Sequence, residues 1–321
     1  MNYLTMAKRA GGEIFSQTEV HSIEKVVDYY RLHINHITLD PSGKVSVSPR
    51  CITCRVLILG AGTIGTTEIL LRSQSQHFIL SSQLGRKWNT NGDTIGLVGI
   101  PNSPEKMDAS FARNRGQGAG PVVQKSLNYP SHSDFTKGVT VLAGNSSSML
   151  SHWMQLDQRT KRSVEHSQRH DLMIGMGHGQ AEGSIHLDRQ GSAVVRWDPN
   201  QDYQARMHSE LARVAEASGG RLHHNPMQKQ PVLHALGGCC MADSPMLGVV
   251  NHKGQVFDTI FGVDQDKMSR EHKIHEGLYI CDSSVIPTSL GCSPQLTIAS
   301  LAERTAQLIT LEPKYADTFD F

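Results

Sequence analysis

Apolar and polar positions form several short patterns along the chain that predict β-strands. Residues 20–23 alternate, and residues 37–47 place two runs around a Pro-Ser-Gly turn, which predicts a hairpin. The segment Arg55-Val-Leu-Ile-Leu59 is continuously apolar after its first residue, which is typical of a strand buried on both faces. Between residues 171 and 197, two further runs flank the turn at 188–191 and predict antiparallel strands.

Helical spacing of apolar positions predicts three helices. The first covers residues 67–72 and follows a glycine-rich turn, and the last covers residues 296–309. The second covers residues 203–217, has one apolar face and is ended by Gly219 and Gly220. Residues 90–150 are rich in Gly, Asn, Ser and Pro and show little periodicity, so they predict long loops over a site.

Length and composition indicate a globular protein. The chain has 321 residues, 38% hydrophobic and 19% charged, which is enough for a large core and two lobes. A net charge of +1 argues against a broad nucleic-acid-binding surface. No apolar run approaches the roughly 20 residues that cross a bilayer, and the first residues lack a signal-peptide core, so we expect a cytoplasmic protein without a membrane span.

The six cysteines allow a zinc site. Cys51 and Cys54 form a CxxC pair, and Cys239 with Cys240 would complete four thiolates. The alternative is that these are free cysteines, because Cys54 opens an apolar run and buried free cysteine is common. We favour the second interpretation, and no spacing of Asp, Glu and His marks a metal site.

Gly60, Gly62 and Gly65 match a GxGxxG fingerprint between a predicted strand and a predicted helix. The acidic residue expected about 20 positions later is missing, because residues 76–85 contain no acid. Two interpretations stay open at this point. Either these glycines contact a cofactor, or they allow tight packing of a helix on a strand.

Residues 282–304 join a polar turn, rich in Gly and Pro, directly to an apolar helix. The start of a helix presents unpaired N–H groups and the positive end of the helix dipole. This junction therefore suits an anionic or planar cofactor.

The chain resembles the glucose–methanol–choline (GMC) flavin oxidoreductases, nearest to the cholesterol-oxidase branch, in three blocks: residues 57–71, 234–241 and 282–304. Trp88-Asn-Thr-Asn-Gly92 resembles the Trp-x-x-Asn-Gly segment of that branch. The blocks occur in family order, and the resemblance extends from about residue 13 to residue 309 with a divergent middle. It implies FAD as the cofactor and places the glycine turn beside the flavin, which is not the family's primary ADP fingerprint.

The resemblance implies an α/β fold with an incomplete, Rossmann-like FAD-binding domain and a mostly antiparallel β-sheet substrate domain with helices. We expect residues 1–95 and 226–321 to form the discontinuous FAD-binding part and residues 96–225 the substrate-binding domain. The family begins with a strand–GxGxxG–helix unit, and residues 1–20 contain none. The chain thus resembles the C-terminal portion of such an enzyme, with an N-terminal FAD-binding partner or a missing segment.

By resemblance, the catalytic positions are His234 and Ser293. His234 lies in a His-x-Leu-Gly-Gly-Cys motif and corresponds to the residue that takes or orients the substrate hydroxyl. Ser293 stands where the family has Asn or His, and a hydroxyl donates only one hydrogen bond. Ser283 replaces the usual Gly. The implied cofactor contacts are Val20, Gly60, Ala61, Gly62, Asp282, Ser283, Pro294 and Gln295.

The family's catalytic glutamate has no clear counterpart. Glu165 lies near the expected position, but we do not assign it. The polar residues 146–169 indicate a solvated surface. Residues 257–275 resemble an insertion, and their charge density favours a solvated loop over a contact for a partner.

The expected activity is FAD-dependent oxidation of the CH–OH group of an alcohol, with hydride transfer to the flavin and His234 as base. The cholesterol-oxidase-like motifs favour a sterol or another bulky hydrophobic alcohol. The alternative is an inactive or partner-dependent fragment that cannot bind FAD alone. An NAD-binding protein using residues 60–65 is less favoured, and so is a serine hydrolase using Ser293, because no GxSxG motif exists.

Overall fold

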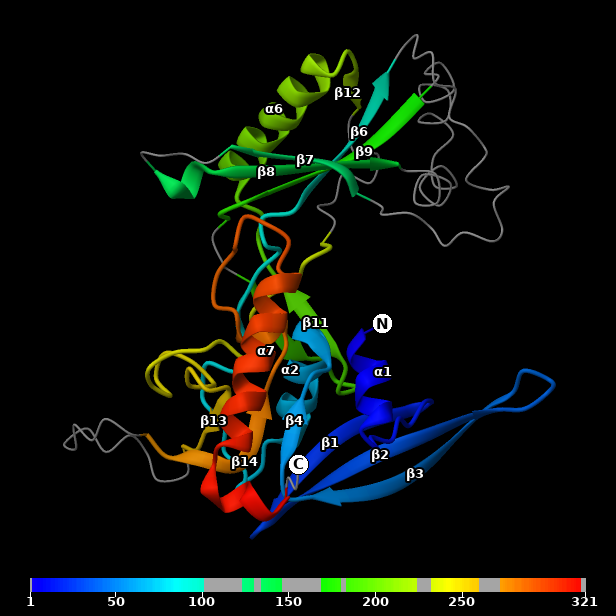
Figure 1. Cartoon of the computed structure of the whole chain (residues 1–321), viewed down its shortest axis with the longest axis vertical. Helices are drawn as coiled ribbons and strands as arrows, with labels where there is room; N and C mark the ends of the chain where they lie inside the picture. The colour runs from blue at the N-terminus through cyan, green and yellow to red at the C-terminus, as the bar shows by residue number, and fades with distance from the viewer. Residues whose placement is uncertain are drawn as a thin grey trace.

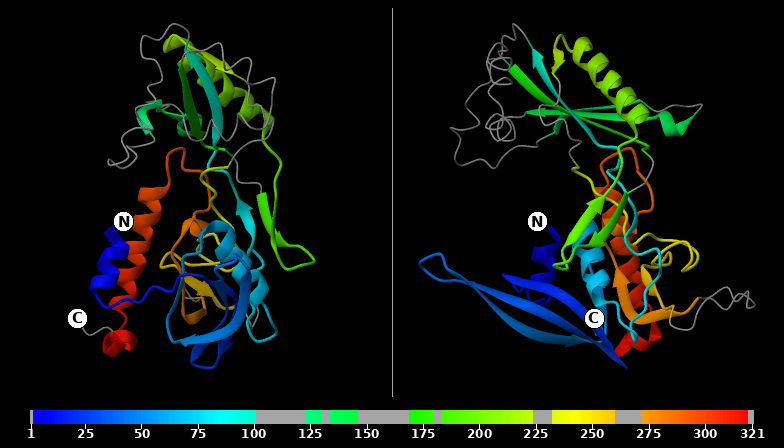
Figure 2. Two further views of the ribbon diagram at one scale, coloured as in Figure 1. Left: turned by 90° about the vertical axis from the view of Figure 1, so that its right-hand side faces the viewer. Right: turned by 180° about the vertical axis from the view of Figure 1, so that it is seen from behind.

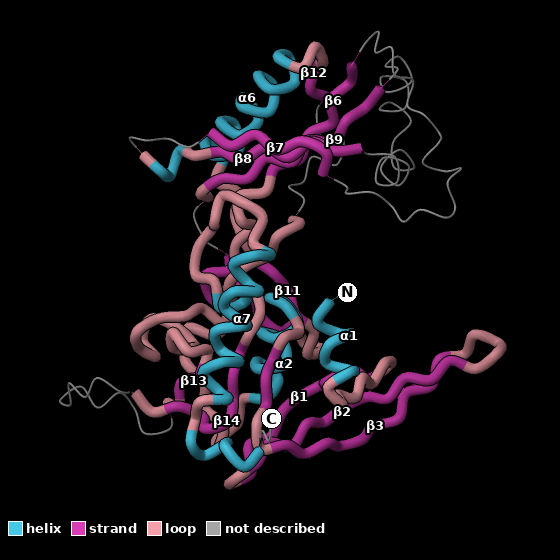
Figure 3. The backbone as a smooth tube through the Cα atoms, viewed as in Figure 1, coloured by secondary structure: helices cyan, strands magenta, loops and turns pink. Residues whose placement is uncertain are grey.

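The protein folds into an upper and a lower lobe, and both ends of the chain lie in the lower one (Figure 1). The structure is a computed structural model that describes residues 2–100, 123–129, 134–145, 169–179, 183–223, 232–259 and 272–318. Glu165, nearly all of residues 146–169 and most of residues 257–275 lie outside this described part. Loops form most of the junction between the lobes (Figure 3).

The upper lobe is a five-stranded antiparallel sheet covered by one helix, α6 (Gln201–Ala217) (Figure 1). In sheet order its strands are β12 (Arg221–His223), β6 (Thr94–Ile100), β9 (Arg169–Gly177), β8 (Val139–Asn145) and β7 (Val123–Tyr129). A short 3-10 helix, η1 (Phe135–Lys137), precedes β8. The prediction of long loops over residues 90–150 is therefore wrong for β6, β7 and β8. The apolar positions of β6 and β8 pack on α6, and β7 is held by its pairing with β8, so these strands depend on tertiary contacts that a local pattern does not reveal.

Helix α6 confirms the helix predicted from residues 203–217. The Asn200 side chain accepts a hydrogen bond from the Tyr203 N–H and caps the first turn. Met207, Leu211 and Ala215 are fully buried at helical spacing and pack on the sheet. The chain leaves the helix at Gly219, whose φ of +75° favours glycine.

The lower lobe is built on a small mixed sheet with the order β13 (Gln255–Phe257), β14 (Ile274–Ile280) and β4 (Leu57–Leu59). Strands β4 and β14 are parallel although more than 200 residues separate them along the chain. Helix α2 (Gly62–Ser73) follows β4, as predicted, and α7 (Gln295–Thr310) confirms the predicted last helix. The 3-10 helices η2 (Ser283–Val285) and η3 (Pro313–Thr318) lie before and after α7.

Strand β4 is not buried on both faces as its apolar run predicts. Leu57 and Leu59 face the lower core, but Ile58 is 49% exposed. β4 is the last strand in the described sheet order. Ile309 and Tyr315 pack on Tyr279, which pairs with Ile58 across the two strands. Ile58 itself stays about half exposed.

A long three-stranded antiparallel sheet extends from the lower lobe as an arm (Figure 2). Its strands are β1 (Thr18–Val26), β2 (Tyr29–Leu39) and β3 (Val45–Cys54). They confirm the predicted strand at residues 20–23 and the hairpin, in whose turn Asp40 accepts N–H groups of Ser42 and Lys44. Helix α1 (Asn2–Arg9) precedes the arm.

A second small sheet contains the hairpin predicted around residues 188–191. β10 (Gly183–Leu187) pairs antiparallel with β11 (Ala193–Arg196) and with β5 (Arg86–Trp88). The mixed α/β architecture with mainly antiparallel sheets, predicted from the sequence, is confirmed.

Candidate functional site

Five of the predicted site residues line one pocket of about 460 Å³: His234, Ser283, Ser293, Pro294 and Gln295. They come from three separate segments of the chain. The remaining lining residues are apolar: Leu233, Ala235, Ile298 and Ala299. A mainly apolar pocket with a few convergent polar groups is typical of a small-molecule site.

His234 forms one wall of this pocket and is held by Asp93. The His234 Nδ1 lies 2.8 Å from Asp93 Oδ1, and the backbone N–H groups of Leu233 and His234 donate to Asp93 Oδ2 at 2.8 and 2.7 Å. The Asp93 side chain is fully buried, whereas the His234 side chain is 22% exposed. The imidazole is therefore anchored at Nδ1 and keeps an accessible side.

Another wall of the same pocket is the turn that leads into α7. The helix begins at Gln295, and Pro294 before it provides no side-chain cap. Asn91 holds this turn, because its Oδ1 accepts the Leu290 N–H and its Nδ2 donates to the Cys292 carbonyl, both at 2.7 Å. The uncapped first turn leaves N–H donors beside Ser293.

Alternate residues of one short segment hold both walls. Asp93 binds the His234 side and Asn91 binds the turn before α7, while Asn89 exchanges two backbone hydrogen bonds with Leu236. The Ser289 hydroxyl also contacts the Asn89 side-chain oxygen at 3.1 Å. We therefore name residues 89–93 the clamp segment.

The sequence reasoning missed Asp93. Asp93 directly follows residues 88–92, the segment that carries the resemblance. The available signal was an acid directly after Asn-Gly in a segment already singled out. Nothing local pairs position 93 with position 234, since 141 residues separate them.

Asp282 directly precedes the pocket residue Ser283 and connects this segment to α2. Its Oδ2 accepts the Gly62 N–H at 2.9 Å and the Thr66 hydroxyl, and its Oδ1 accepts the Ser284 N–H. The carboxylate is thus occupied in joining β14 to the start of α2. Thr63 extends this link by hydrogen bonds to the Ser283 hydroxyl and the Ala235 carbonyl.

Gly60, Ala61 and Gly62 lie next to this link but do not line the pocket. A Cβ added at Gly60 or Gly62 would meet no atom within 4 Å, so these two glycines are not required by close packing. Gly62 has a φ of +79°, which favours glycine. Only Gly65 shows a tight approach, to the Ala61 Cβ at 3.1 Å. Open space at Gly60 and Gly62 leaves room for close approach of a ligand.

Val20 lies apart from these residues. It belongs to β1, is half-buried against the lower core and does not line the pocket. The structure therefore does not bring Val20 together with the other predicted cofactor contacts at the pocket.

None of the six cysteines, all of which lie within the described residues, forms a disulfide bond. Cys51 is exposed on β3 whereas Cys239 and Cys240 are buried, and no group of metal-binding side chains occurs in the described part of the chain. Burial raises the pKa of the Cys239 thiol to about 12 and also raises that of Cys240. Exposed Cys51 and the two buried cysteines therefore lie in different environments.

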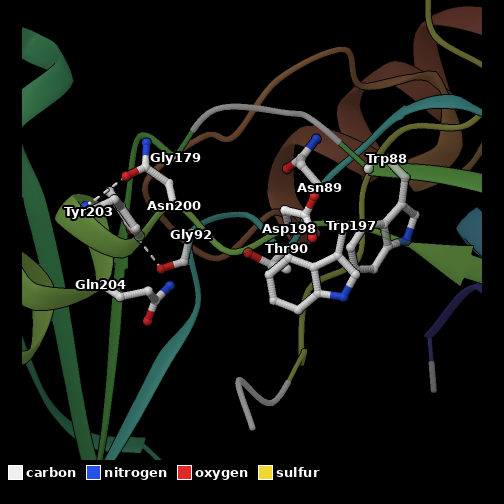
Figure 4. A pocket seen from close by; sticks show the side chains of 11 residues that line it. Trp88, Asn89, Thr90, Gly92, Gly179, Trp197, Asp198, Asn200, Tyr203 and Gln204 are labelled. Carbon is white, nitrogen blue, oxygen red and sulfur yellow. Dashed lines mark hydrogen bonds between the residues drawn. The ribbon is translucent and has the colours of Figure 1, made fainter.

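A second, smaller pocket of about 30 Å³ lies at the junction of the lobes (Figure 4). The Trp88 and Trp197 rings lie 5.6 Å apart between centroids, and the Trp88 Nε1 is buried without a partner among the described residues. The Tyr203 hydroxyl of α6 donates to the Gly92 carbonyl at 2.7 Å, as the dashed line shows. The upper lobe is thus hydrogen-bonded to the clamp segment through Tyr203.

Comparison with known proteins agrees with the sequence resemblance. A family model described as GMC oxidoreductase matches residues 263–302, which include Asp282, Ser283, Ser293, Pro294 and Gln295. A cholesterol oxidase of Mycobacterium tuberculosis is 23% identical over 344 residues, covering 96% of this chain and 55% of that protein. A cholesterol oxidase of Acinetobacter baumannii is 36% identical over 76 residues, covering 24% of this chain and 11% of that protein.

This chain is related to the GMC oxidoreductases. Solved structures agree at the level of the fold. An FAD-dependent oxidoreductase from Chaetomium thermophilum has a TM-score of 0.60 at 13% identity, covering 97% of this chain and 64% of that one. A fungal aryl-alcohol oxidase has a TM-score of 0.57 at 13% identity, covering 97% and 63%.

The chain spans about half the length of the curated GMC-type relatives that it matches, 55% for the mycobacterial protein. No helix within the described residues is long and apolar enough to cross a bilayer.

Proposed function

We propose that this chain supplies the alcohol-oxidising site of an FAD-dependent oxidoreductase that acts on the CH–OH group. The observation that carries the proposal is the pocket that both His234, anchored by Asp93, and the uncapped start of α7 line. The cholesterol oxidases and the FAD-dependent oxidoreductase named above support the same reaction class.

The residues present fit a flavin. The first turn of α7 offers unpaired N–H donors and a positive dipole end beside Ser293, Pro294 and Gln295, which suits the polar edge of an isoalloxazine ring. The open space at Gly60 and Gly62 would admit another part of the cofactor near Ser283. Bound FAD supplies a two-electron acceptor for the hydride that leaves the alcohol carbon.

His234 would remove the hydroxyl proton of the substrate. An imidazole exchanges protons near neutral pH, and general-base catalysis by a positioned side chain contributes about 10²–10⁴-fold. Ser293, which is exposed and lines the same pocket, would orient the same hydroxyl with its single donor. We propose these roles for His234 and Ser293 together.

The substrate we propose is a bulky hydrophobic alcohol of the sterol type. Leu233, Ala235 and Ile298 give the pocket an apolar lining, which favours an apolar body around one hydroxyl group. The named activity of the cholesterol oxidases points in the same direction.

We also propose that a further segment, from a longer chain or from a partner subunit, completes the flavin site. The supporting observation is β4, which ends the described sheet and leaves Ile58 49% exposed. A parallel strand added there would pair the open edge of β4 and cover Ile58. In this alternative, the 321 residues bind FAD only together with that segment.

Flavin binding and turnover test the proposal. The purified chain is titrated with FAD, alone and with a candidate FAD-binding partner, and assayed with cholesterol for hydrogen peroxide and for dye reduction. We expect a visible flavin spectrum and a loss of turnover of about 10²-fold or more in His234→Gln with FAD binding retained. His77→Gln, which changes an exposed histidine away from the pocket, is the matched control and should keep full activity. Absence of FAD binding under both conditions overturns the proposal.

A further inference from the structure

We infer that Asp93 is a positioning residue that fixes His234 in its Nδ1-protonated form, so that Nε2 is the atom available to accept a proton in the pocket. The inference deepens the proposed function and rests on it for its catalytic meaning. Its structural content, the position of one proton, can be measured independently of any flavin.

The assignment follows from the donor and acceptor inventory around Asp93. An ionised carboxylate has only acceptors, so the 2.8 Å contact between Oδ1 and Nδ1 requires the proton to be on His234 Nδ1. A neutral imidazole has one N–H, and Nε2 therefore carries a lone pair. No hydrogen bond to Nε2 occurs among the described residues, and His234 lines the pocket.

Three hydrogen-bond donors from residues 233 and 234 reach the buried carboxylate of Asp93. The side chain is fully buried, and an isolated carboxylate in such a place is strongly disfavoured. The two backbone N–H groups on Oδ2 satisfy the oxygen that does not face the ring. The same two bonds fix the backbone of Leu233 and His234, so one carboxylate sets both the backbone position and the ring orientation of the histidine.

Tyr203 is the titratable neighbour on the upper lobe. Burial is the main reason that the pKa of Tyr203 is raised, and the negative charge of Asp93 raises it further. The tyrosine therefore stays neutral and donates its proton to the Gly92 carbonyl, next to Asp93. The neutral tyrosine adds no charge beside Asp93, and the donors from residues 233 and 234 stabilise the carboxylate.

The first test is the tautomer of His234, read by ¹⁵N NMR of histidine-labelled protein and assigned by the missing signal in His234→Gln. We expect Nδ1–H in the wild type. His275 is an internal reference of the opposite kind, because its Nε2 lies 3.1 Å from the Ile79 carbonyl and must carry the proton there. In Asp93→Asn, the amide oxygen keeps the two backbone N–H groups and the amide NH₂ donates to Nδ1, which moves the proton to Nε2. An Nε2–H signal in the wild type, or an unchanged signal in Asp93→Asn, overturns the inference.

The second test is turnover. Asp93→Asn preserves shape, and we expect kcat to fall about 10²–10⁴-fold with little change in KM, since a wrong tautomer removes the base without removing the pocket. Asp188→Asn is the control, because Asp188 also accepts two backbone N–H groups but faces no histidine. It should leave both kcat and the tautomer unchanged. A kcat of Asp93→Asn within twofold of wild type, in an enzyme that needs His234, overturns the inference.

The two tests separate the inference from the proposed function. If His234 shows the expected tautomer switch but the chain never turns over an alcohol, the proposed function fails and the role of Asp93 in placing the proton stands. If turnover depends on His234 but its proton does not respond to Asp93→Asn, the function stands and the inference fails.

Discussion

The upper and lower cores differ in how far along the chain their residues come together. The upper core draws all its buried residues from positions 98–215, on antiparallel strands and α6. The lower core joins positions 23–84 to positions 236–286, and its β4–β14 pair is parallel (Figure 1). Closing so long a loop has a larger entropic cost than local pairing.

This difference places the site. Each wall of the pocket belongs to the late part of the chain, and the clamp segment that holds both walls belongs to the early part. The pocket therefore forms only after the early and late segments of the lower core have come together. The upper lobe meets the clamp segment through Tyr203 and supplies none of the lining residues of the pocket.

The largest effect we expect is from Gly237→Ala in the lower core. A Cβ there would lie 2.0 Å from the Lys87 carbonyl oxygen at a φ of +82°, and both obstacles are backbone features that cannot move away. Overpacking and left-handed strain together should lower the free energy of unfolding by about 3 kcal/mol or more, measured by denaturant unfolding. Gly219→Ala in the upper lobe has a similar φ, +75°, but meets no atom within 4 Å. Its cost should be about 1 kcal/mol. Equal losses in both variants would contradict the role of close packing at Gly237.

The next comparison removes one fully buried leucine from each core. Leu70→Ala in the lower core and Leu211→Ala in the upper core should each cost about 2–5 kcal/mol, from lost burial and the cavity left behind. Hydrogen exchange followed by mass spectrometry should show loss of amide protection mainly in the lobe that carries the change. Leu70→Ala should also weaken FAD binding, whereas Leu211→Ala should not. Uniform loss of protection across both lobes in either variant would show that the two cores unfold as one unit.

Asp282→Asn tests the link that joins the late β14 to the early α2. The amide cannot satisfy both the Gly62 N–H and the Ser284 N–H as well as the carboxylate does, and the site is 7% exposed. We expect a loss of about 1–3 kcal/mol in the free energy of unfolding. Asp188→Asn, in an exposed hairpin turn, should change this free energy by no more than about 0.5 kcal/mol. A loss at Asp282 as small as that at Asp188 would mean that the link does not stabilise the lower lobe.

The smallest effect concerns pH. Burial lowers the pKa of His275, the Lys25 charge lowers it further, and the nearby Asp258 carboxylate opposes both. The folded protein thus prefers neutral His275, so its stabilising contribution is present above the unfolded pKa of about 6.5 and is lost as pH falls below it. His275→Gln should reduce the fall in unfolding midpoint between pH 7.5 and pH 5.5. His223→Gln in the upper lobe, where burial lowers the pKa of a more exposed histidine, should reduce it less. Identical pH profiles for the wild type and His275→Gln would rule out this contribution.

Local patterns predicted much of the fold. Helices α2, α6 and α7 and the strands of the two hairpins lie where the apolar spacing and the turn residues indicate. β6 was missed because its partner β9 is distant in the chain, and β7 and β8 were missed because the Gly- and Asn-rich region around them shows little periodicity. The burial of β4 was overestimated because an apolar run does not show which faces other elements cover.

The sequence by itself determined where α2, α6 and α7 lie along the chain, the relation to GMC oxidoreductases and five residues that share one pocket. Only the tertiary structure decided that Asp93 holds His234, that Asn91 holds the turn before α7, and that Val20 lies elsewhere. The physical reason is the range of the forces. Periodicity and capping act over a few neighbouring residues, whereas the pairing of position 93 with position 234 forms only after a loop of that length has closed.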